Sequence, residues 1–355
     1  MIILPSVNRS PFGQLADGRS VERFTLSNGR GLECDVISYG GIITALRVPV
    51  RDGQVVDVVL GFNNLEDYLA PHPYFGTVVG RVAGRISGGG FTLDGKHYPL
   101  ERNDPPNHLH GGSGGFDKKL WLIASLQTTD DQASLRLSYL SPEHEEGYPG
   151  NLRVEVTYSV TVGNELVISY SAETDEATPV SLTNHSYFNL AGEGNGDILG
   201  QTLQIFSDEI AVTDAAMTLL GTKSPVAGHG NDLTKPRLLG EVIPGLLNHH
   251  GDNYFVRRSA PRTLVPTAVL SNPASGLTMT ALTTCDCVQV YSAFHLDGTL
   301  TGKSGDSYVK HAGLCLECQH CPEAVHSPEL GDIILRPGQQ YDQTTAYRFE
   351  TLPLS

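Results

Sequence analysis

The amino-acid sequence predicts an all-β protein, a large antiparallel β-sandwich with few short helices. Two observations support this prediction. Apolar and polar residues alternate with a period of two along several segments, which is typical of strands that bury one face. Helical periodicity is scarce, and no helical pattern of about 10–15 residues separates the predicted strands, as parallel βαβ units would require. With this many strands, two packed sheets are the simplest arrangement.

The clearest strand signal covers residues 152–160, in which every second residue is apolar. A Gly163-Asn164 turn follows, and the alternation resumes over residues 166–170. The two segments therefore form a predicted hairpin. Another alternating run covers residues 135–139.

Two Asp-Gly pairs indicate further hairpins, because this dipeptide adopts positive φ at low cost. One pair, residues 52–53, follows the apolar stretch 42–50. The second, residues 94–95, separates two short apolar segments.

Helices are expected at only two places, residues 64–69 and 239–247, and Pro244 interrupts the second. Residues 219–239 are rich in Gly, Pro, Asn and Thr and predict a long surface loop. Because no linker or low-complexity tract divides the chain, we expect one domain over residues 1–355.

The composition excludes several classes of partner. Hydrophobic residues make up 39% of the 355 residues, so the chain can bury a core without a metal or disulfide staple. Acidic residues outnumber basic ones by 39 to 24, a net charge of −15, and no Lys/Arg run is present. Nucleic acid and anionic membranes need a basic surface, so neither is an expected partner, whereas a neutral ligand is compatible with this charge.

The N-terminal segment starts with four apolar residues and lacks a basic region before them, unlike a signal peptide. No apolar run approaches the roughly 18 residues of a membrane span. These features predict a soluble, cytoplasmic protein.

Five of the six cysteines lie in two late clusters, and three of them, Cys315, Cys318 and Cys321, have C-x₂-C-x₂-C spacing. Zinc or an iron–sulfur cluster would use such thiolates. On a strand, however, Cys315 and Cys318 face opposite ways. We therefore predict free, mostly buried thiols and no metal site.

Candidate site residues gather in segments where polar side chains interrupt apolar ones. Each has a structural alternative: His110 could cap a glycine turn, and His185 could be a buried, hydrogen-bonded histidine. Arg81 and Arg85 would by default each pair with an internal carboxylate. Glu317 is more informative because it lies in an apolar strand, where burying a carboxylate costs several kcal/mol unless it is paired or protonated.

Nine segments in order carry a resemblance to a known family. They are YFGTVVGRVAGRI (74–86), NHLHGG (107–112), GYPGNL (147–152), TNHSYFNLAG (183–192), GDNYF (251–255), VQVY (288–291), LDGT (296–299), LCLECQHCPE (314–323) and ILRPGQQY (334–341). Over residues ~35 to ~350 the chain resembles the aldose 1-epimerase, or galactose mutarotase, family.

The resemblance implies a β-sandwich of the supersandwich type. It also implies an isomerase that interconverts the α and β anomers of free hexoses such as glucose and galactose without a cofactor. By motif match it assigns the site residues as follows: Glu317 as general base, His185 as general acid, His110 as second histidine, and Arg85, Asp252 and Gln289 as substrate-binding residues.

The implied chemistry suits these residue types. A base removes the proton of the C1 hydroxyl while an acid protonates the ring oxygen O5, the ring opens, and rotation about C1–C2 precedes closure to the other anomer. His185 would have to be cationic at the start, which a neighbouring carboxylate would favour. Trp121 or a nearby aromatic ring could stack on the sugar.

Some positions depart from the family pattern. Gly84 stands where Asn is usual, Cys321 where Phe is usual, His326 where Asn is usual, and Cys287 where Gly is common. These departures bear on substrate preference. A non-catalytic carbohydrate-binding or regulatory protein of the same fold is the main alternative. A hexose-phosphate epimerase would need more basic residues, and a glycosidase would need two carboxylates about 5–9.5 Å apart.

Overall fold

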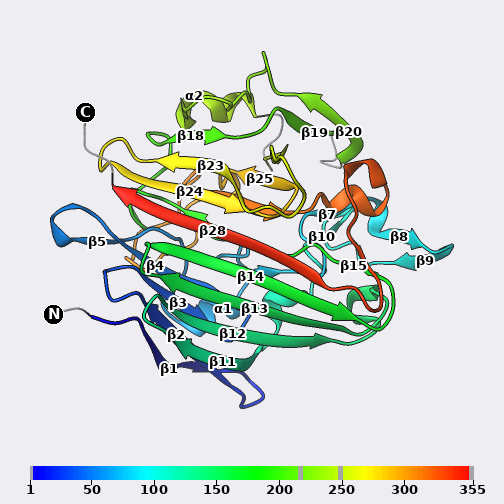
Figure 1. Ribbon diagram of the computed structural model, residues 1–355, viewed down its shortest axis with the longest axis horizontal. Helices are drawn as coiled ribbons and strands as arrows, with labels where there is room; N and C mark the ends of the chain where they lie inside the picture. The colour runs from blue at the N-terminus through cyan, green and yellow to red at the C-terminus, as the bar shows by residue number, and fades with distance from the viewer. Residues whose placement is uncertain (1–2, 215–218, 247–250, 352–355) are drawn as a thin grey trace.

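A nine-stranded antiparallel sheet spans the front of the molecule in the computed structural model, which describes residues 3–214, 219–246 and 251–351 (Figure 1). In spatial order its strands are β11 (Leu122–Thr128), β12 (Gln132–Ser141), β13 (Leu152–Thr161), β14 (Glu165–Thr174), β28 (Tyr341–Thr351), β24 (Leu277–Thr283), β23 (Val265–Ser271), β18 (Thr202–Ile205) and β21 (Arg237–Leu238).

Two further sheets lie behind it. The six-stranded sheet has the order β17 (Tyr187–Phe188), β26 (Leu314–Gln319), β25 (Cys287–Tyr291), β22 (Asp252–Phe255), β19 (Glu209–Thr213) and β20 (Leu219–Pro225). The five-stranded sheet is formed by β1 (Ser6–Gln14), β2 (Ser20–Ser27), β3 (Glu33–Ile37), β4 (Ile43–Pro49) and β5 (Val55–Asp57).

Short elements connect the sheets. Four two-stranded pairs are β6 (Val78–Val79) with β16 (Thr183–Asn184), β7 (Arg85–Ile86) with β10 (His108–Leu109), β8 (Gly90–Leu93) with β9 (Lys96–Pro99), and β15 (Thr178–Pro179) with β27 (Ile334–Leu335). The helices are α1 (Leu65–Leu69), α2 (Leu239–Val242) and 3₁₀ turns at Arg51–Gly53, Ser87–Gly89, Phe116–Lys118, Glu145–Gly147, Ile243–Gly245, Pro322–Val325 and Pro328–Leu330.

The core lies between the nine-stranded sheet and the other two. One apolar cluster joins Val156 of β13 to Leu46 of β4 and Leu316 of β26, all at most 1% exposed. Val156 belongs to the buried half of the alternating strand β13, as the sequence pattern requires, whereas β26 is buried on both faces. The predicted β-sandwich is therefore confirmed.

The predicted hairpins are present. Strands β13 and β14 contain residues 152–160 and 166–170, and Asn164 in the turn between them has φ 56°. The Asp94-Gly95 pair joins β8 to β9 with φ 50° and 81°. Residues 52–53 also lie in a hairpin, between β4 and β5, but within a 3₁₀ turn.

Both expected helices are present and short. The Asn64 side chain caps α1 by accepting a hydrogen bond from the Asp67 N–H at 2.9 Å. Helix α2 passes into a 3₁₀ turn at Pro244, while Leu247 lies outside the described residues.

The expected loop over residues 219–239 is wrong at both ends, because residues 219–225 form the edge strand β20 and residues 237–238 form the edge strand β21. An edge strand with polar, exposed side chains pairs through its main chain alone and carries little apolar signal.

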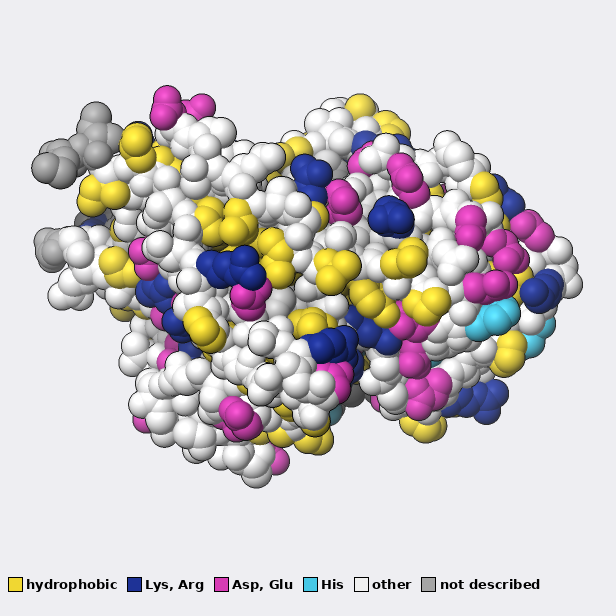
Figure 2. All heavy atoms as spheres, turned by 90° about the horizontal axis from the view of Figure 1, so that it is seen from below, with side chains coloured by type: hydrophobic (Ala, Val, Ile, Leu, Met, Phe, Trp, Pro, Cys, Tyr) yellow, Lys and Arg dark blue, Asp and Glu magenta, His cyan; other side chains and the backbone are white. Residues whose placement is uncertain are grey.

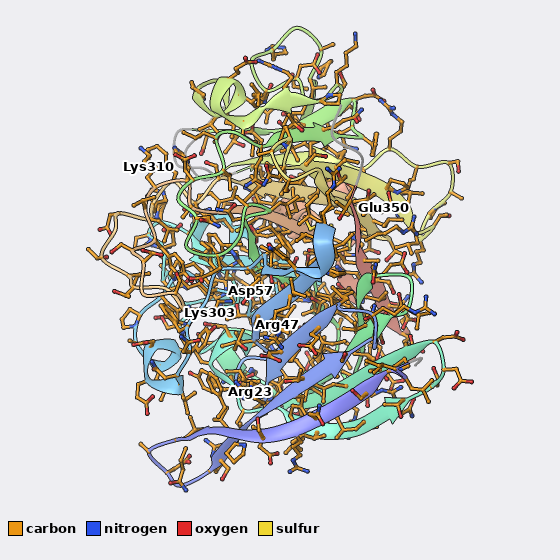
Figure 3. All side chains as sticks on the ribbon, turned by 90° about the vertical axis from the view of Figure 1, so that its left-hand side faces the viewer. Arg23, Arg47, Asp57, Lys303, Lys310 and Glu350 are labelled. Atoms are coloured by element: carbon orange, nitrogen blue, oxygen red, sulfur yellow. The ribbon has the colours of Figure 1, made fainter. Side chains whose placement is uncertain are left out.

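The charged side chains hold peripheral segments to the sheets. Figure 3 shows Lys303 beside Asp57, and its Nζ donates to Asp57 Oδ2 at 2.7 Å and to the carbonyls of Thr44 and Val59 at 2.8 Å.

On the face shown in Figure 2, hydrophobic side chains are interspersed with charged ones. None of the helices in the described part of the chain has the length and apolar character needed to traverse a lipid bilayer.

Candidate active site

Strand β26 places Glu317 in a row of polar side chains. In the antiparallel register Glu317 opposes Gln289 on β25, and Gln289 opposes Asn253 on β22. Directly opposed residues project from the same face of a sheet, so the three side chains lie side by side. Leu316 and Cys318 project from the other face into the main core, as the alternation predicted.

His185 reaches the same row from the segment just before the neighbouring strand β17. In the pairing of β17 with β26, Tyr187 opposes Cys315, so the residue two positions earlier arrives opposite Glu317. The His185 Nε2 lies 3.6 Å from Glu317 Oε2. The His185 ring is stacked between Tyr187, at a centroid distance of 5.1 Å, and Tyr74, at 5.8 Å. These two stacking contacts restrict the orientation of the ring.

His110 is held by a glycine-rich turn. Its main-chain N–H donates to the Gly84 carbonyl at 3.0 Å, and the Gly84 N–H donates to His110 Nδ1 at 3.1 Å. A Cβ at Gly111 would lie 1.9 Å from the Gly80 carbonyl oxygen, so only glycine permits this close approach. His110 thus caps the glycine turn through its Nδ1, as the structural alternative in the sequence analysis predicted. Its ring also packs edge-on against the ring of His185, at a centroid distance of 5.3 Å.

A cavity of about 240 Å³ opens in front of these residues. Five of the six predicted site residues line it: Glu317, His185, His110, Arg85 and Gln289. The other lining residues are Pro73, Tyr74, Gly84, Asp104, Leu109, Tyr187, Thr213, Leu219, Gly251, Asn253, Tyr291, His295, Gln319 and Pro322.

Asp252 is the predicted site residue that the structure does not bring into this cavity. It opposes Val290, so it projects from the sheet face opposite to Glu317, and its Oδ2 accepts a hydrogen bond from Asn231 Nδ2 at 3.0 Å. Its neighbour Asn253 lines the cavity instead.

The two arginines of the 75–86 segment have different roles. Arg85 Nε donates to Asp104 Oδ2 at 2.7 Å at the edge of the cavity, the expected carboxylate pairing. Arg81 is 2% exposed and donates to four main-chain carbonyls of residues 141–150 and to the hydroxyls of Ser141 and Thr178. The expectation of a carboxylate partner for Arg81 is wrong, because carbonyls of the GYPGNL segment and its surroundings satisfy this guanidinium.

Burial changes the proton affinities of the central pair in opposite directions. It lowers the pKa of His185 to about 4 and raises the pKa of Glu317 to about 8, although the positive charge of Arg85 opposes the second change. Burial likewise lowers the pKa of His110 well below its usual value. Burial thus opposes the positive charge expected on His185, and the ligand-free pair holds its one proton on Glu317 near neutral pH.

The three central residues also resemble a metal-ligand set. Ligand atoms of His110, His185 and Glu317 lie within 4.8 Å of one another. A neutral imidazole that binds metal through Nε2 carries its proton on Nδ1 and donates it to an acceptor. At His110 the Gly84 N–H donates to Nδ1, so the proton belongs on Nε2. This arrangement suits a hydrogen-bond donor to a ligand better than a metal ligand.

The thiols do not converge on one point. Cys315 belongs to the cavity side of β26 and Cys318 to the core side, and all six cysteines are buried and unpaired.

The departures from the family pattern lie around this strand. Gly84 has φ 81°, and a Cβ there would lie 2.8 Å from Pro322 Cγ, so an asparagine would require Pro322 to move.

The remaining departures lie behind the cavity. Cys287 and Cys321 share a hydrogen bond, and His326 Nδ1 lies 2.6 Å from Glu323 Oε1, a contact that raises the pKa of His326. The cavity is not lined by these three residues, Cys287, Cys321 and His326.

Sequence reasoning missed several lining residues. Tyr74 is the first residue of the segment 74–86, but no pattern in the sequence predicted that its ring stacks on His185. Asn253 and Gln319 were also missed, and their Oδ1 and Oε1 atoms are buried acceptors without a hydrogen-bond partner among the described residues. Trp121 is not a stacking platform in the cavity, because it lies in the main core and its indole N–H donates to the Phe116 carbonyl at 3.2 Å.

Comparisons with known proteins agree with this site. Residues 22–348 match the aldose 1-epimerase family. The chain is 46% identical to galactose mutarotase of Rattus norvegicus, over 97% of this chain and 98% of that protein. It is 44% identical to galactose mutarotase of Homo sapiens (98% and 99%) and 32% identical to aldose 1-epimerase of Escherichia coli K12 (94% and 96%).

Solved structures give the same result. A galactose 1-epimerase from Lactobacillus acidophilus superposes with a TM-score of 0.84 at 25% identity, covering 98% of this chain and 99% of that one. An aldose epimerase homologue from C. elegans superposes with a TM-score of 0.83 at 27% identity (91% and 97%).

The fold and these matches define the protein as an isomerase of the epimerase class. The chain belongs to the aldose 1-epimerase family, as its sequence motifs predicted, and has aldose 1-epimerase activity.

Proposed function

We propose that this enzyme interconverts the α and β anomers of free hexoses, galactose and glucose among them, with Glu317 as the base and His185 as the acid. The observation that carries the proposal is the 3.6 Å contact between His185 Nε2 and Glu317 Oε2 at the wall of the cavity. The relatives named galactose mutarotase support galactose as a substrate.

The reaction requires one proton removed and one delivered. Glu317 takes the proton of the C1 hydroxyl while His185 Nε2 protonates the ring oxygen O5, and the C1–O5 bond breaks to give the open-chain aldehyde. Rotation about C1–C2 presents the other face of the carbonyl group. Ring closure then returns both protons, and the enzyme regains its starting state.

The pair needs one shared proton for this cycle. Burial favours the neutral pair with the proton on Glu317, because it lowers the pKa of His185 and raises the pKa of Glu317. Attraction between opposite charges 3.6 Å apart favours the carboxylate–imidazolium form and so opposes this effect of burial. Transfer of the same proton from Glu317 to His185 converts the neutral form into the form that starts the reaction.

The other lining residues support the reacting groups. His110 presents its Nε2–H to the cavity, since Gly84 occupies Nδ1, and can stabilise charge that develops on a sugar oxygen. Arg85 favours the ionised form of Glu317. Gln289 and Asn253 lie in the row beside Glu317 and offer amide groups to hydroxyls, while Asp252 remains a predicted binding residue behind them.

Alternative functions fit less well. Asp104 and Glu317 are the carboxylates among the described residues that line the cavity, and Asp104 is paired with Arg85. A glycosidase would need both carboxyl groups for the acid and base steps. A sugar-binding protein without turnover would not need the His185–Glu317 pair. The net charge of −15 and the described structure are compatible with a cytoplasmic enzyme acting on a neutral sugar.

Polarimetry of freshly dissolved α-galactose and α-glucose tests the proposal. We expect faster mutarotation than in buffer and a bell-shaped dependence of kcat/KM on pH. The pair gains a second proton below about pH 4 and loses its only proton above about pH 8, so activity falls at both limits. His185→Asn should lower kcat by about two orders of magnitude while sugar still binds. Unchanged kcat in this variant would remove His185 from the mechanism.

A further inference from the structure

Cys315 contacts the side of His185 that faces away from Glu317. Its Sγ lies 3.6 Å from His185 Nδ1, and the residue is fully buried. Cys315 does not line the cavity among the described residues. Any influence on the reaction must therefore pass through its neighbours, and among these His185 is the one that the proposed reaction uses.

The neighbours of Cys315 hold its sulfur in place. In the register it stands between Tyr187 on β17 and Tyr291 on β25. Burial raises the pKa of the Cys315 thiol well above its usual range, and a hydrogen bond from Tyr187 opposes this only in part. The group is thus a neutral thiol, which donates weakly and accepts weakly.

The proposed chemistry places a demand on the Nδ1 of His185. Nε2 must give a proton to O5 and later take it back, so it must be bare whenever the imidazole is neutral. The single proton of the neutral ring must then reside on Nδ1 and needs an acceptor there. The acceptors near this side of the ring are the Cys315 sulfur and the main-chain carbonyl of His185 itself.

We infer that Cys315 is a positioning residue of the reaction: its sulfur accepts the Nδ1–H of His185 and so leaves Nε2 to exchange a proton with the sugar. This inference rests on the proposed role of His185 as the acid. It gives a function to one member of the cysteine cluster and none to Cys318, which projects from the opposite face of the strand.

Kinetics of Cys315→Ala and Cys315→Ser test the inference. Loss of the acceptor should lower kcat about 3- to 10-fold, the scale of one hydrogen bond, with KM changed less than about twofold. The acidic limb of the pH profile should move to lower pH, because the imidazolium loses an acceptor. The serine hydroxyl restores an acceptor and should recover most of kcat and the position of the limb.

Cys318→Ala is the matched control, since Cys318 lies on the same strand, is 1% exposed and loses the same atoms. It should leave the acidic limb in place, and thermal unfolding of every variant establishes that each is folded. An equal shift of the limb in Cys318→Ala, or a serine variant no better than the alanine variant, would overturn the inference.

Nitrogen-15 NMR of histidine-labelled enzyme reads the tautomer without turnover. We expect neutral His185 protonated at Nδ1 in the wild type and a mixture of tautomers in Cys315→Ala. Protonation at Nε2 in the wild type would contradict the inference even if His185→Asn is inactive. Full activity of His185→Asn, by contrast, would refute the proposed acid role while the tautomer remains measurable.

Discussion

The two faces of β26 are equally buried yet serve opposite purposes. Leu316 is 1% exposed and Glu317 is 3% exposed, although they are consecutive residues of one strand. The side chain of Leu316 joins the main apolar core, whereas that of Glu317 borders the cavity 3.6 Å from His185. Low exposure therefore does not distinguish a structural residue from a reactive one. The two are distinguished by the groups that each side chain contacts.

The cost of burial also differs between the faces. Removing a leucine from water stabilises the fold, whereas removing a carboxyl group from water disfavours its charged form. Burial accordingly raises the pKa of Glu317 to about 8. Burial of the core face raises the free energy of unfolding. Burial of the carboxyl group on the other face lowers it, but holds a group that is reactive near neutral pH.

The largest expected effect is on the reactive face. Glu317→Gln keeps the size of the side chain but removes the base, so kcat should fall by at least about two orders of magnitude in the polarimetric assay. Glu323→Gln is the control, because Glu323 is 4% exposed and binds Ser87 and His326 outside the cavity. Near-normal turnover of Glu317→Gln would show that the two faces do not differ in this way.

A substitution on the core face should change turnover less than one on the reactive face and should clearly lower stability. Leu316→Ala should lower the free energy of unfolding by about 2–5 kcal/mol, because the cavity that it leaves is closed off in the core. The turnover number per folded molecule should remain close to that of the wild type. Denaturant unfolding and active-enzyme titration check both parts, and a loss of turnover comparable to that of Glu317→Gln would break the comparison.

The smallest expected effect is the pH dependence of stability. The folded protein holds the Glu317 proton up to about pH 8, whereas the unfolded chain releases it near the model-peptide value of about 4.5. The contribution of Glu317 to stability therefore declines between these pH values, whereas the amide introduced by Glu317→Gln cannot titrate. The stability advantage of Glu317→Gln should be at least about 1 kcal/mol larger at pH 8 than at pH 5, measured by denaturant unfolding.

Glu155→Gln, at a partly exposed position on β13 beside Arg136, controls for loss of a carboxyl group outside the cavity. A stability difference between Glu317→Gln and the wild type that stays constant with pH would mean that burial does not hold the Glu317 proton.

Local patterns were sufficient to predict the strands, because alternation along β13 and β14 reports directly which face is buried. The motifs also predicted five residues that meet at the cavity. Patterns could not separate Arg81 from Arg85, which occur four positions apart in one segment. Their different partners, carbonyls near residue 150 and the carboxylate of Asp104, come from parts of the chain that only the tertiary structure brings close.

The positions of Asp252 and Tyr74 were unpredictable for the same reason. The motif indicated that Asp252 matters, but the pairing with Val290 decides the face on which its side chain lies. Tyr74 stacks on His185 from a segment more than a hundred residues away, and no local periodicity encodes such a contact.

The alternation along β26 limits how this chain can change in length. A single residue inserted between Leu314 and Leu316 would exchange the two faces, so that a leucine would border the sugar and the carboxyl group would enter the apolar interior. A change in length of this strand therefore preserves its two faces only when it involves an even number of residues, whereas most side chains of β20, at the edge of the same sheet, are not buried and restrict its length less.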